Sequence, residues 1–558
     1  MVGKMSGSWF RGFVLAEVAL LALLAGSGDV RAADESDRTN VVVILADDLG
    51  YSDLGCYGGE IQTPVLDELA RQGVQFTQFY NTARCWPTRA ALLTGYYPQQ
   101  IRRDKLEGIP SGNGGQRPAW AQLLPARLKA KGYRAYHSGK WHLDGSPQAG
   151  GFDRAYSLDD HDRFFGPKNH SEDGKKLPVP AADEDYYATS AIAEHAIRCL
   201  REHRERAGDR PFFSYIAFTA PHFPLQAPQA DIERCRPRYK AGWDRLREER
   251  WASMQKLGLP SVGLSPMDRN QGPTYPQADT LAKLGPAERE RAEPWGELPE
   301  SVQAFQAEKM AIHAAMIERM DAEIGRIVAE LKAMGEFERT LFVFLSDNGA
   351  SAEMMVRGDG HNREVPAGGA GTFLCLGPGW SSLANTPFHK HKTWVHEGGI
   401  STPFILHWPA GLAEAHGLRA VPGHVIDVVP TVLEVAGVDV EGLGGTGSDA
   451  AGEPELAAPG LPGQSLLPVL RGEAEQLHPW LWWQHEGNRA YREGDWKIVA
   501  AGEQSAWELY DLSQDRTELR NLAEAQPERV RQLEEAWNQQ LARFRVDATR
   551  DLPPGENK

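Results

Sequence analysis

The stretch TNVVVILADDLG, residues 39–50, decides the fold class of this chain. Val41 to Ala46 form an unbroken apolar run that is rich in β-branched side chains, and Asp47 and Asp48 follow it directly. Such a run is typical of a strand that is buried on both faces of a parallel sheet. The sequence therefore predicts an α/β protein with helices on both sides of a mostly parallel sheet.

A second stretch, RTLFVFLSDNG, residues 339–349, has the same layout. The apolar run Leu341 to Leu345 precedes Asp347 and Asn348. The segment before it is predicted to be a helix, because apolar residues recur there at helical spacing. That stripe consists of Ile317, Met320, Ile324, Ile327 and Leu331.

Further strands are predicted in GYRAYHSGKWH, in PFFSYIAFTAPH and at residues 403–407. Ligands bind outside the carboxyl ends of the strands in open α/β sheets, so we expect the polar residues at these ends to meet. Each residue alone could be a turn residue, a helix cap or a solvated side chain. Their shared position favours a site, and they are Asp47, Asp48, Lys140, His142, His222, Asp347 and Asn348.

Oxygen ligands dominate the acidic part of this set, which suits Ca²⁺ or Mg²⁺ better than zinc. Three carboxylates packed together also need a cation, because like charges at short range cannot all stay ionised. Basic and imidazole groups around them would trap a tetrahedral oxyanion, either sulfate or phosphate. The alternative is a group of surface charges that never meet. The candidate anion-binding residues are Arg89, Lys140, His142, His222 and Lys392.

A lone cysteine stands in NTARCWPTRAALLTG, residues 81–95, just before a predicted helix. Cys85 could serve in packing, in metal binding or as a reactive group. A thiolate beside Arg89 would be a nucleophile, yet it is a soft ligand that suits a hard-cation site poorly. The chain has five cysteines without CxxC spacing, and in an oxidising compartment an odd number leaves at least one thiol unpaired or modified. They are Cys56, Cys85, Cys199, Cys235 and Cys375.

The run CWPTR followed by LTG, within residues 85–95, resembles the sulfatase signature C-x-P-S-R-x-x-x-x-T-G. The blocks ADDLGYSDLGCYGG, GKWHL, TAPHFP, SDNG and HKTWVHEGGISTPF are similar to further sulfatase blocks, in the same order. The resemblance extends from about Asn40 to the C-terminal helix. It implies that Cys85 is oxidised to formylglycine before folding, by a formylglycine-generating or an anaerobic sulfatase-maturating enzyme. The hydrated aldehyde would then be an oxygen ligand.

The resemblance also implies the roles of the site residues. One Ca²⁺ would be held by Asp47, Asp48, the modified Cys85, Asp347 and Asn348. One hydroxyl of hydrated residue 85 would attack sulfur, and His222 or Lys392 would protonate the leaving alcohol. His142 would take the proton of the second hydroxyl as sulfate is eliminated. Arg89 would hold residue 85, while Lys140 and Lys392 neutralise sulfate oxygens.

Three positions depart from the family pattern. Thr88 replaces the usual serine and keeps a hydroxyl, and Trp86 places a large ring at the variable position. His389 stands where many relatives have arginine. Lys392 is aligned with the family lysine because it lies five residues before Glu397 of the EGG block.

The N-terminus reads as a secretory signal peptide, residues 1–32. Lys4 and Arg11 precede the apolar run Phe13 to Ala25, and Val30-Arg31-Ala32 offers a small-residue cleavage site. An uncleaved N-terminal anchor is the alternative. The sequence thus predicts a periplasmic or secreted protein that has no stable membrane insertion after cleavage.

Two domains follow in the prediction, a catalytic domain at residues 33–471 and an α+β subdomain at residues 472–558. The resemblance implies that the first has an alkaline-phosphatase-like sheet, mixed but mostly parallel and sandwiched by helices. The second, after a Gly/Pro-rich stretch at residues 442–463, would be a small antiparallel sheet with one helix from Pro527 to Phe544. Between the sheet segments, Trp243, Trp251 and Trp295 could form a substrate wall, although local core is the favoured reading for each.

The formal net charge of −16 argues against non-specific nucleic-acid binding. The resemblance to the sulfatases implies a different function, the hydrolysis of carbohydrate or aryl sulfate esters. One alternative is a phosphomonoester, phosphodiester or phosphonate-ester hydrolase of the same fold. The other is a non-catalytic anion-binding relative, which would be favoured if Cys85 were unmodified. The ligand set disfavours a site with two zinc ions.

Overall fold

Ten strands form one large sheet in the computed structural model. The structure describes residues 1, 3, 38–181, 185–259, 263–270, 272, 275–412, 415–438 and 457–552, so the predicted signal peptide lies almost entirely outside the described residues. In spatial order the strands are β11 (Gly417–Arg419), β2 (Val74–Phe76), β10 (Phe404–His407), β9 (Thr340–Ser346), β1 (Asn40–Ala46), β8 (Phe212–Ala217), β4 (Arg134–Gly139), β5 (Arg154–Leu158), β6 (His170–Glu172) and β7 (Lys175–Lys176).

The centre of this sheet is parallel, as predicted. Strands β9, β1, β8, β4 and β5 run in the same direction, whereas β10 pairs antiparallel with β9 and β6 pairs antiparallel with β5. In the central register, Val43 lies opposite Val343 on one side and Tyr215 on the other. Every residue of β1 is buried, which explains its unbroken apolar sequence.

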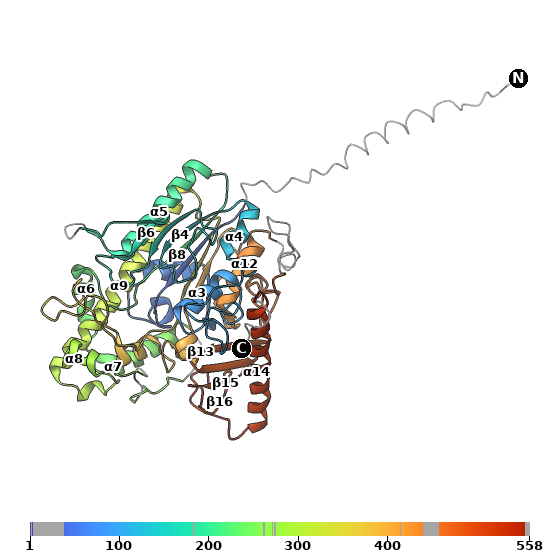
Figure 1. The fold of residues 1–558 in the computed structure, drawn as a ribbon. Helices are drawn as coiled ribbons and strands as arrows, with labels where there is room; N and C mark the ends of the chain where they lie inside the picture. Colours follow the sequence, from blue (N-terminus) through green and yellow to red (C-terminus); the bar gives the residue numbers. More distant parts are fainter. Residues whose placement is uncertain are drawn as a thin grey trace. The chain divides into compact units, whose positions relative to one another are not determined.

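Alternate residues of β1 enter two different cores. Val42 and Ile44 pack with α5 (Ala188–Ala207) and α9 (Glu300–Met334), and the predicted apolar stripe of α9 is fully buried there. Val41 and Val43 pack on the other face, with α3 (Cys85–Thr94) and α12 (Val428–Val435). Figure 1 shows α5 and α9 on one side of β4 and β8, with α3, α4 (Leu124–Leu128) and α12 on the other side.

The tryptophans of the middle region belong to the core. The rings of Trp243 and Trp295 meet edge to face at 4.8 Å, and both contact the buried ring of Trp380. The favoured reading as local core is confirmed for these two, and a substrate wall built from them is wrong. Trp251 is half-buried. Helices α7 (Gly242–Lys256) and α10 (Gly377–Ala384) carry Trp243 and Trp380. Other α-helices in the described residues are α2 (Pro64–Gln72), α6 (Gln229–Cys235), α8 (Ala278–Leu284), α11 (Glu397–Ile400) and α13 (Leu467–Leu470).

The C-terminal part forms the predicted small antiparallel sheet. Its strands are β13 (Trp480–His485), β14 (Asn488–Glu493), β15 (Trp496–Ala500) and β16 (Glu508–Asp511), and α14 (Pro527–Thr549) lies beside them (Figure 1). The helix ends five residues later than predicted, because Phe544 and Ala548 are still buried on its inner face. A separate pair, β3 (Phe79–Tyr80) and β12 (Gly423–His424), completes the strands of the described chain.

Buried charges join the small sheet to the rest of the chain. Nζ of Lys497 lies 3.0 Å from Glu397 and 2.8 Å from Glu518, and all three side chains are buried. Trp483 donates its indole N–H to the carbonyl of Asn81 at 2.9 Å. Residues 39–558 form one compact unit, so the boundary at residue 471 stays a prediction. Within the described residues, no helix is long and apolar enough to cross a membrane.

Candidate active site

The ends of β1 and β9 bring Asp47 and Asp347 together around one arginine. The guanidinium of Arg89, on α3, lies 2.7 Å from Oδ2 of Asp347 and 3.4 Å from Oδ2 of Asp47. It also donates to the carbonyl of Lys140, whose own ammonium lies 2.5 Å from Asp47. All four side chains are buried, so these charges interact with little screening by water.

Asp48 contacts the remaining residues of the site. Its backbone has φ 65°, which turns the chain sharply after β1. Lys392 lies 2.8 Å from its carboxylate, Asn348 donates an N–H to it at 2.7 Å, and Nε2 of His222 lies 3.7 Å away. The strand ends therefore bring together the acidic and basic residues that the sequence pattern singled out.

Two oxygens of this cluster are buried without a hydrogen-bond partner in the described structure, Oδ1 of Asp47 and Oδ1 of Asn348. Burial and the neighbouring Asp47 raise the pKa of Asp347 to about 7. Burial opposes ionisation of Asp47 too, yet Lys140, His222 and Arg89 hold its pKa well below the usual range. Oxygen atoms with free lone pairs beside crowded carboxylates fit a hard divalent cation.

Cys85 occupies the first position of α3 and is 4% exposed. Its Sγ and one carboxylate oxygen each from Asp47 and Asp347 all lie within 4.8 Å of one another. Burial raises the pKa of the thiol, even though Lys140 and Lys392 act in the opposite direction. The unmodified residue would therefore stay a protonated thiol, which is a poor nucleophile.

The Thr88 hydroxyl has a structural role in the loop before α3. It accepts the backbone N–H of Thr82 at 3.1 Å and contacts the Thr82 hydroxyl at 2.8 Å. A serine would offer the same oxygen, so this departure keeps the local geometry. His389, which departs from the pattern near Lys392, has its Nε2 3.5 Å from Glu518 of the C-terminal part.

The histidines form a chain of rings beside the carboxylates. The rings of His142 and His161 stack at 5.9 Å, and the ring of His161 meets that of His222 at 5.3 Å. Trp86 contacts His142 from another direction at 5.8 Å. Burial lowers the pKa of all three histidines, with Lys140 adding to the effect on His142 and Lys392 adding to it on His222. Burial of the three rings therefore favours their neutral form.

Sequence reasoning missed two groups near the cluster. Glu353 lies 3.1 Å from Lys392 and 2.9 Å from Arg84, and nothing in its loop sequence marks it. His161 follows β5, so recognition of this strand would have placed it with the other strand-end residues.

Residues 39–438 match the family model described as Sulfatase. This chain belongs to the sulfatase family. It is 32% identical over 553 residues to an uncharacterised sulfatase of Schizosaccharomyces pombe, covering 90% of this chain and 93% of the relative. It is also 32% identical over 458 residues to an arylsulfatase of Klebsiella aerogenes, covering 75% and 91%.

Solved structures share the fold of this sulfatase. A crystal structure of Ps i-CgsB in complex with k-i-k-neocarrahexaose superposes with a TM-score of 0.61 at 22% identity, covering 93% of this chain and 99% of the other. The predicted alkaline-phosphatase-like fold is confirmed, and this sulfatase is a sulfuric ester hydrolase. Sulfatases generally use a metal ion and formylglycine, and the acidic cluster described above could hold such an ion.

Proposed function

We propose that this sulfatase hydrolyses carbohydrate or aryl sulfate esters with a formylglycine formed from Cys85, in the periplasm or outside the cell. The position of Cys85 carries the proposal. Its Sγ shares a 4.8 Å neighbourhood with oxygens of Asp47 and Asp347, where a thiol is neither a good ligand nor a good nucleophile. A hydrated aldehyde at the same position would supply oxygen atoms, which suit both tasks.

The proposed metal ligands are Asp47, Asp48, Asp347, Asn348 and the modified residue 85. Their oxygen chemistry and the two unpartnered oxygens support one Ca²⁺. When bound, the ion would supply positive charge for the sulfate oxygens and for the hydroxyl of residue 85.

Three cationic side chains would stabilise negative charge on residue 85 and on the sulfate group during the reaction. Arg89 is fixed by Asp347 and by the carbonyl of Lys140, so it can hold residue 85 in one orientation. Lys140 and Lys392 border the same cluster and would neutralise sulfate oxygens. Because these groups are buried and already positioned, little reorganisation is needed when sulfate binds.

Proton transfer would involve two histidines. Nδ1 of His222 contacts the carbonyl of Phe223 and so carries the ring proton, which leaves Nε2 facing Asp48. His222 could give a proton to the leaving alcohol once a bound anion favours its charged form, and Lys392 is the other candidate acid. His142 is neutral and its buried Nδ1 has no hydrogen-bond partner in the described structure, which suits a proton acceptor.

The substrate class rests on the relatives and the location rests on the sequence. An arylsulfatase relative supports aryl sulfates, and the structural neighbour that binds neocarrahexaose supports sugar sulfates. The predicted signal at residues 1–32 supports export. The expected partners are the small sulfated substrate and a formylglycine-forming enzyme, with no nucleic acid.

The test uses protein that is coexpressed with a formylglycine-generating enzyme. We expect kcat/KM for an aryl sulfate to exceed that for the matching aryl phosphate, because the site offers one group of metal ligands and phosphate monoesters carry nearly two charges. The variant Cys85→Ala should be folded and inactive. A preference for phosphate would support the alternative hydrolase and contradict this proposal.

A further inference from the structure

Two pockets adjoin the catalytic cluster, and Arg357 lines both of them. One has a volume of about 620 Å³ and includes Asp162, which directly follows His161. The other has a volume of about 510 Å³ and includes Lys392 and Glu353. A substrate whose sulfate lies beside Lys392 would therefore occupy a pocket that Arg357 also lines.

The other cations of these pockets already have carboxylate partners. Arg163 lies 2.7 Å from Asp160, Arg84 lies 2.9 Å from Glu353, and Lys392 contacts both Asp48 and Glu353. In contrast, Arg357 makes no ion pair or hydrogen bond within the described part of the chain, and its side chain is exposed. Its charge is thus available to a ligand.

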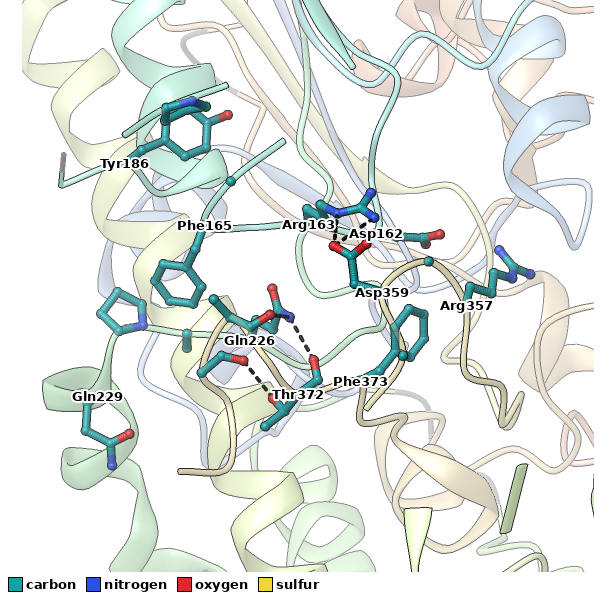
Figure 2. A pocket seen from close by; sticks show the side chains of 18 of the residues that line it. Asp162, Arg163, Phe165, Tyr186, Gln226, Gln229, Arg357, Asp359, Thr372 and Phe373 are labelled. Carbon is teal, nitrogen blue, oxygen red and sulfur yellow. Dashed lines mark hydrogen bonds and ion pairs between the residues drawn. The ribbon is translucent and has the colours of Figure 1, made fainter. Parts of the chain in front are cut away.

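The close-up supports this distinction. Figure 2 shows Arg163 held against Asp359 inside the larger pocket, whereas Arg357 lies at one end with its guanidinium directed away from Phe165 and Gln226. Asp162 lies toward the same end. Arg357 is therefore at the border of the pocket, on the side of Phe373 and far from Phe165.

The ring of Phe223 contacts both Arg357 and Lys392 and so sets an upper limit on the distance between them. The guanidinium carbon is 5.7 Å from the ring centroid, and Nζ of Lys392 is 5.5 Å from the same centroid. The two cations are therefore no further apart than the sum of these distances, about 11 Å. His222 stands next to this ring, at 4.1 Å between centroids.

We propose that Arg357 binds a second anionic group of the substrate, a carboxylate or another sulfate, while the scissile sulfate lies at the Lys392 end. The inference rests on the proposed sulfatase function and narrows its substrates to acidic saccharides. One or two sugar rings can span the distance between the two cations. Phe373, which lies beside Arg357 in the larger pocket, offers an apolar surface that suits the face of a sugar ring.

The test compares substrates in matched pairs. Each pair consists of sulfated sugars that differ in one second sulfate, or in one neighbouring uronate carboxylate, and 4-nitrophenyl sulfate is the reference without a second anion. Wild type, Arg357→Ala, Arg357→Lys and the control Arg163→Ala are measured for kcat and KM. The control removes a cation from the same pocket that is already paired with Asp160 and Asp359.

We expect wild type to prefer the doubly anionic member of a pair. Arg357→Ala should reduce this preference by about 10- to 100-fold, mainly through KM, because a charge-assisted hydrogen bond is lost. Arg357→Lys should restore part of it, and Arg163→Ala should leave it near the wild-type value. The pair that shows the effect identifies sulfate or carboxylate as the bound group.

Three results would overturn the inference. An unchanged preference in Arg357→Ala, with sugar sulfates still hydrolysed, would remove Arg357 from recognition and leave the proposed function intact. Hydrolysis of 4-nitrophenyl sulfate without hydrolysis of any sugar sulfate would also contradict a role of Arg357 in recognising acidic saccharides, and would leave the proposed sulfatase function intact. Absence of turnover on every sulfate ester would reject the proposed function itself, and this inference with it.

Discussion

The Glu353 carboxylate lies 3.1 Å from Nζ of Lys392. Asp48 contacts the same ammonium at 2.8 Å, and Arg84 contacts Glu353 at 2.9 Å. Asp48 is also a proposed metal ligand, so Glu353 is the carboxylate that can stay with Lys392 when Asp48 faces an ion. Glu353 is therefore a candidate positioning residue for this lysine.

Replacing Glu353 tests this role. Glu353→Gln should lower kcat on alkyl or sugar sulfates by about 10- to 100-fold, because general acid catalysis depends on the position of the donor. Aryl sulfates with good leaving groups should suffer less, and Glu353→Asp should recover part of the loss. Equal losses on all substrates, together with a lower Tm, would indicate a merely structural role.

Conversion of Cys85 is expected to be visible in the peptide that spans it. Protein made with a formylglycine-generating enzyme should show the aldehyde mass, and activity should rise with the converted fraction. The physical reason is that burial keeps an unmodified thiol protonated. Fully active protein with an intact, alkylatable thiol at this position would contradict the prediction.

Metal removal should abolish turnover. Exhaustive chelation leaves Asp47, Asp48 and Asp347 crowded without a divalent ion, and added Ca²⁺ should restore activity better than Zn²⁺ because the ligands are hard oxygens. Ca²⁺ should also raise the Tm of the chelated protein, and Asp347→Asn should weaken that rise. Metal analysis that finds two zinc ions per active chain would reject the proposed site.

The acid role of His222 and Lys392 predicts a dependence on the leaving group. Alanine at either position should reduce kcat/KM most for alkyl and sugar sulfates, because an activated phenol needs little protonation to leave. Wild type and both variants are compared on a series of aryl sulfates and one sugar sulfate. Equal losses across the series would leave these residues as sulfate binders.

Strand pattern was enough to predict the sheet and most of the cluster. Asp47 and Asp347 could be placed because each follows an unbroken buried run, and parallel strands end at one edge of the sheet. His161 was missed because the strand before it, RAYSL, has no such run. Glu353 was missed because it reaches Lys392 through a loop, and loop geometry depends on contacts far away in the sequence. Cys85 could be interpreted only through the family resemblance.

Stability should depend on the buried charges between the small sheet and α11. Lys497→Met leaves Glu397 and Glu518 buried without their shared cation, which should lower the free energy of unfolding by about 3–5 kcal/mol. Lys175→Met, at an exposed lysine of β7, is the matched control and should change little. Chemical denaturation of both variants measures the difference, and equal stability would refute a role for these three buried charges.

The pH dependence of this stability follows from the same buried carboxylates, Glu397 and Glu518. Burial opposes ionisation of Glu397, yet Lys497 and Arg516 hold its pKa below the ordinary value of 4.5, and Lys497 also holds the pKa of Glu518 down. A carboxyl group whose pKa is lower in the folded state than in the unfolded state stabilises the fold at pH values above its ordinary pKa. This stabilisation is lost as the pH falls below about 4.5. Acid should destabilise wild type more steeply than Lys497→Met, in which protonation relieves repulsion.

The burial of Cys85 means that its proposed modification has to precede closure of the site. The residues that enclose it come from distant parts of the chain, since Asp347 follows Cys85 by 262 residues and Lys392 comes later still. In a chain that folds as it is made, at about 5–20 residues per second, roughly 13–50 seconds pass before Asp347 exists. The site cannot close before that time, so a maturation enzyme has at least this interval in which to act, and a chain that closes the site unmodified would be correctly folded but permanently inactive.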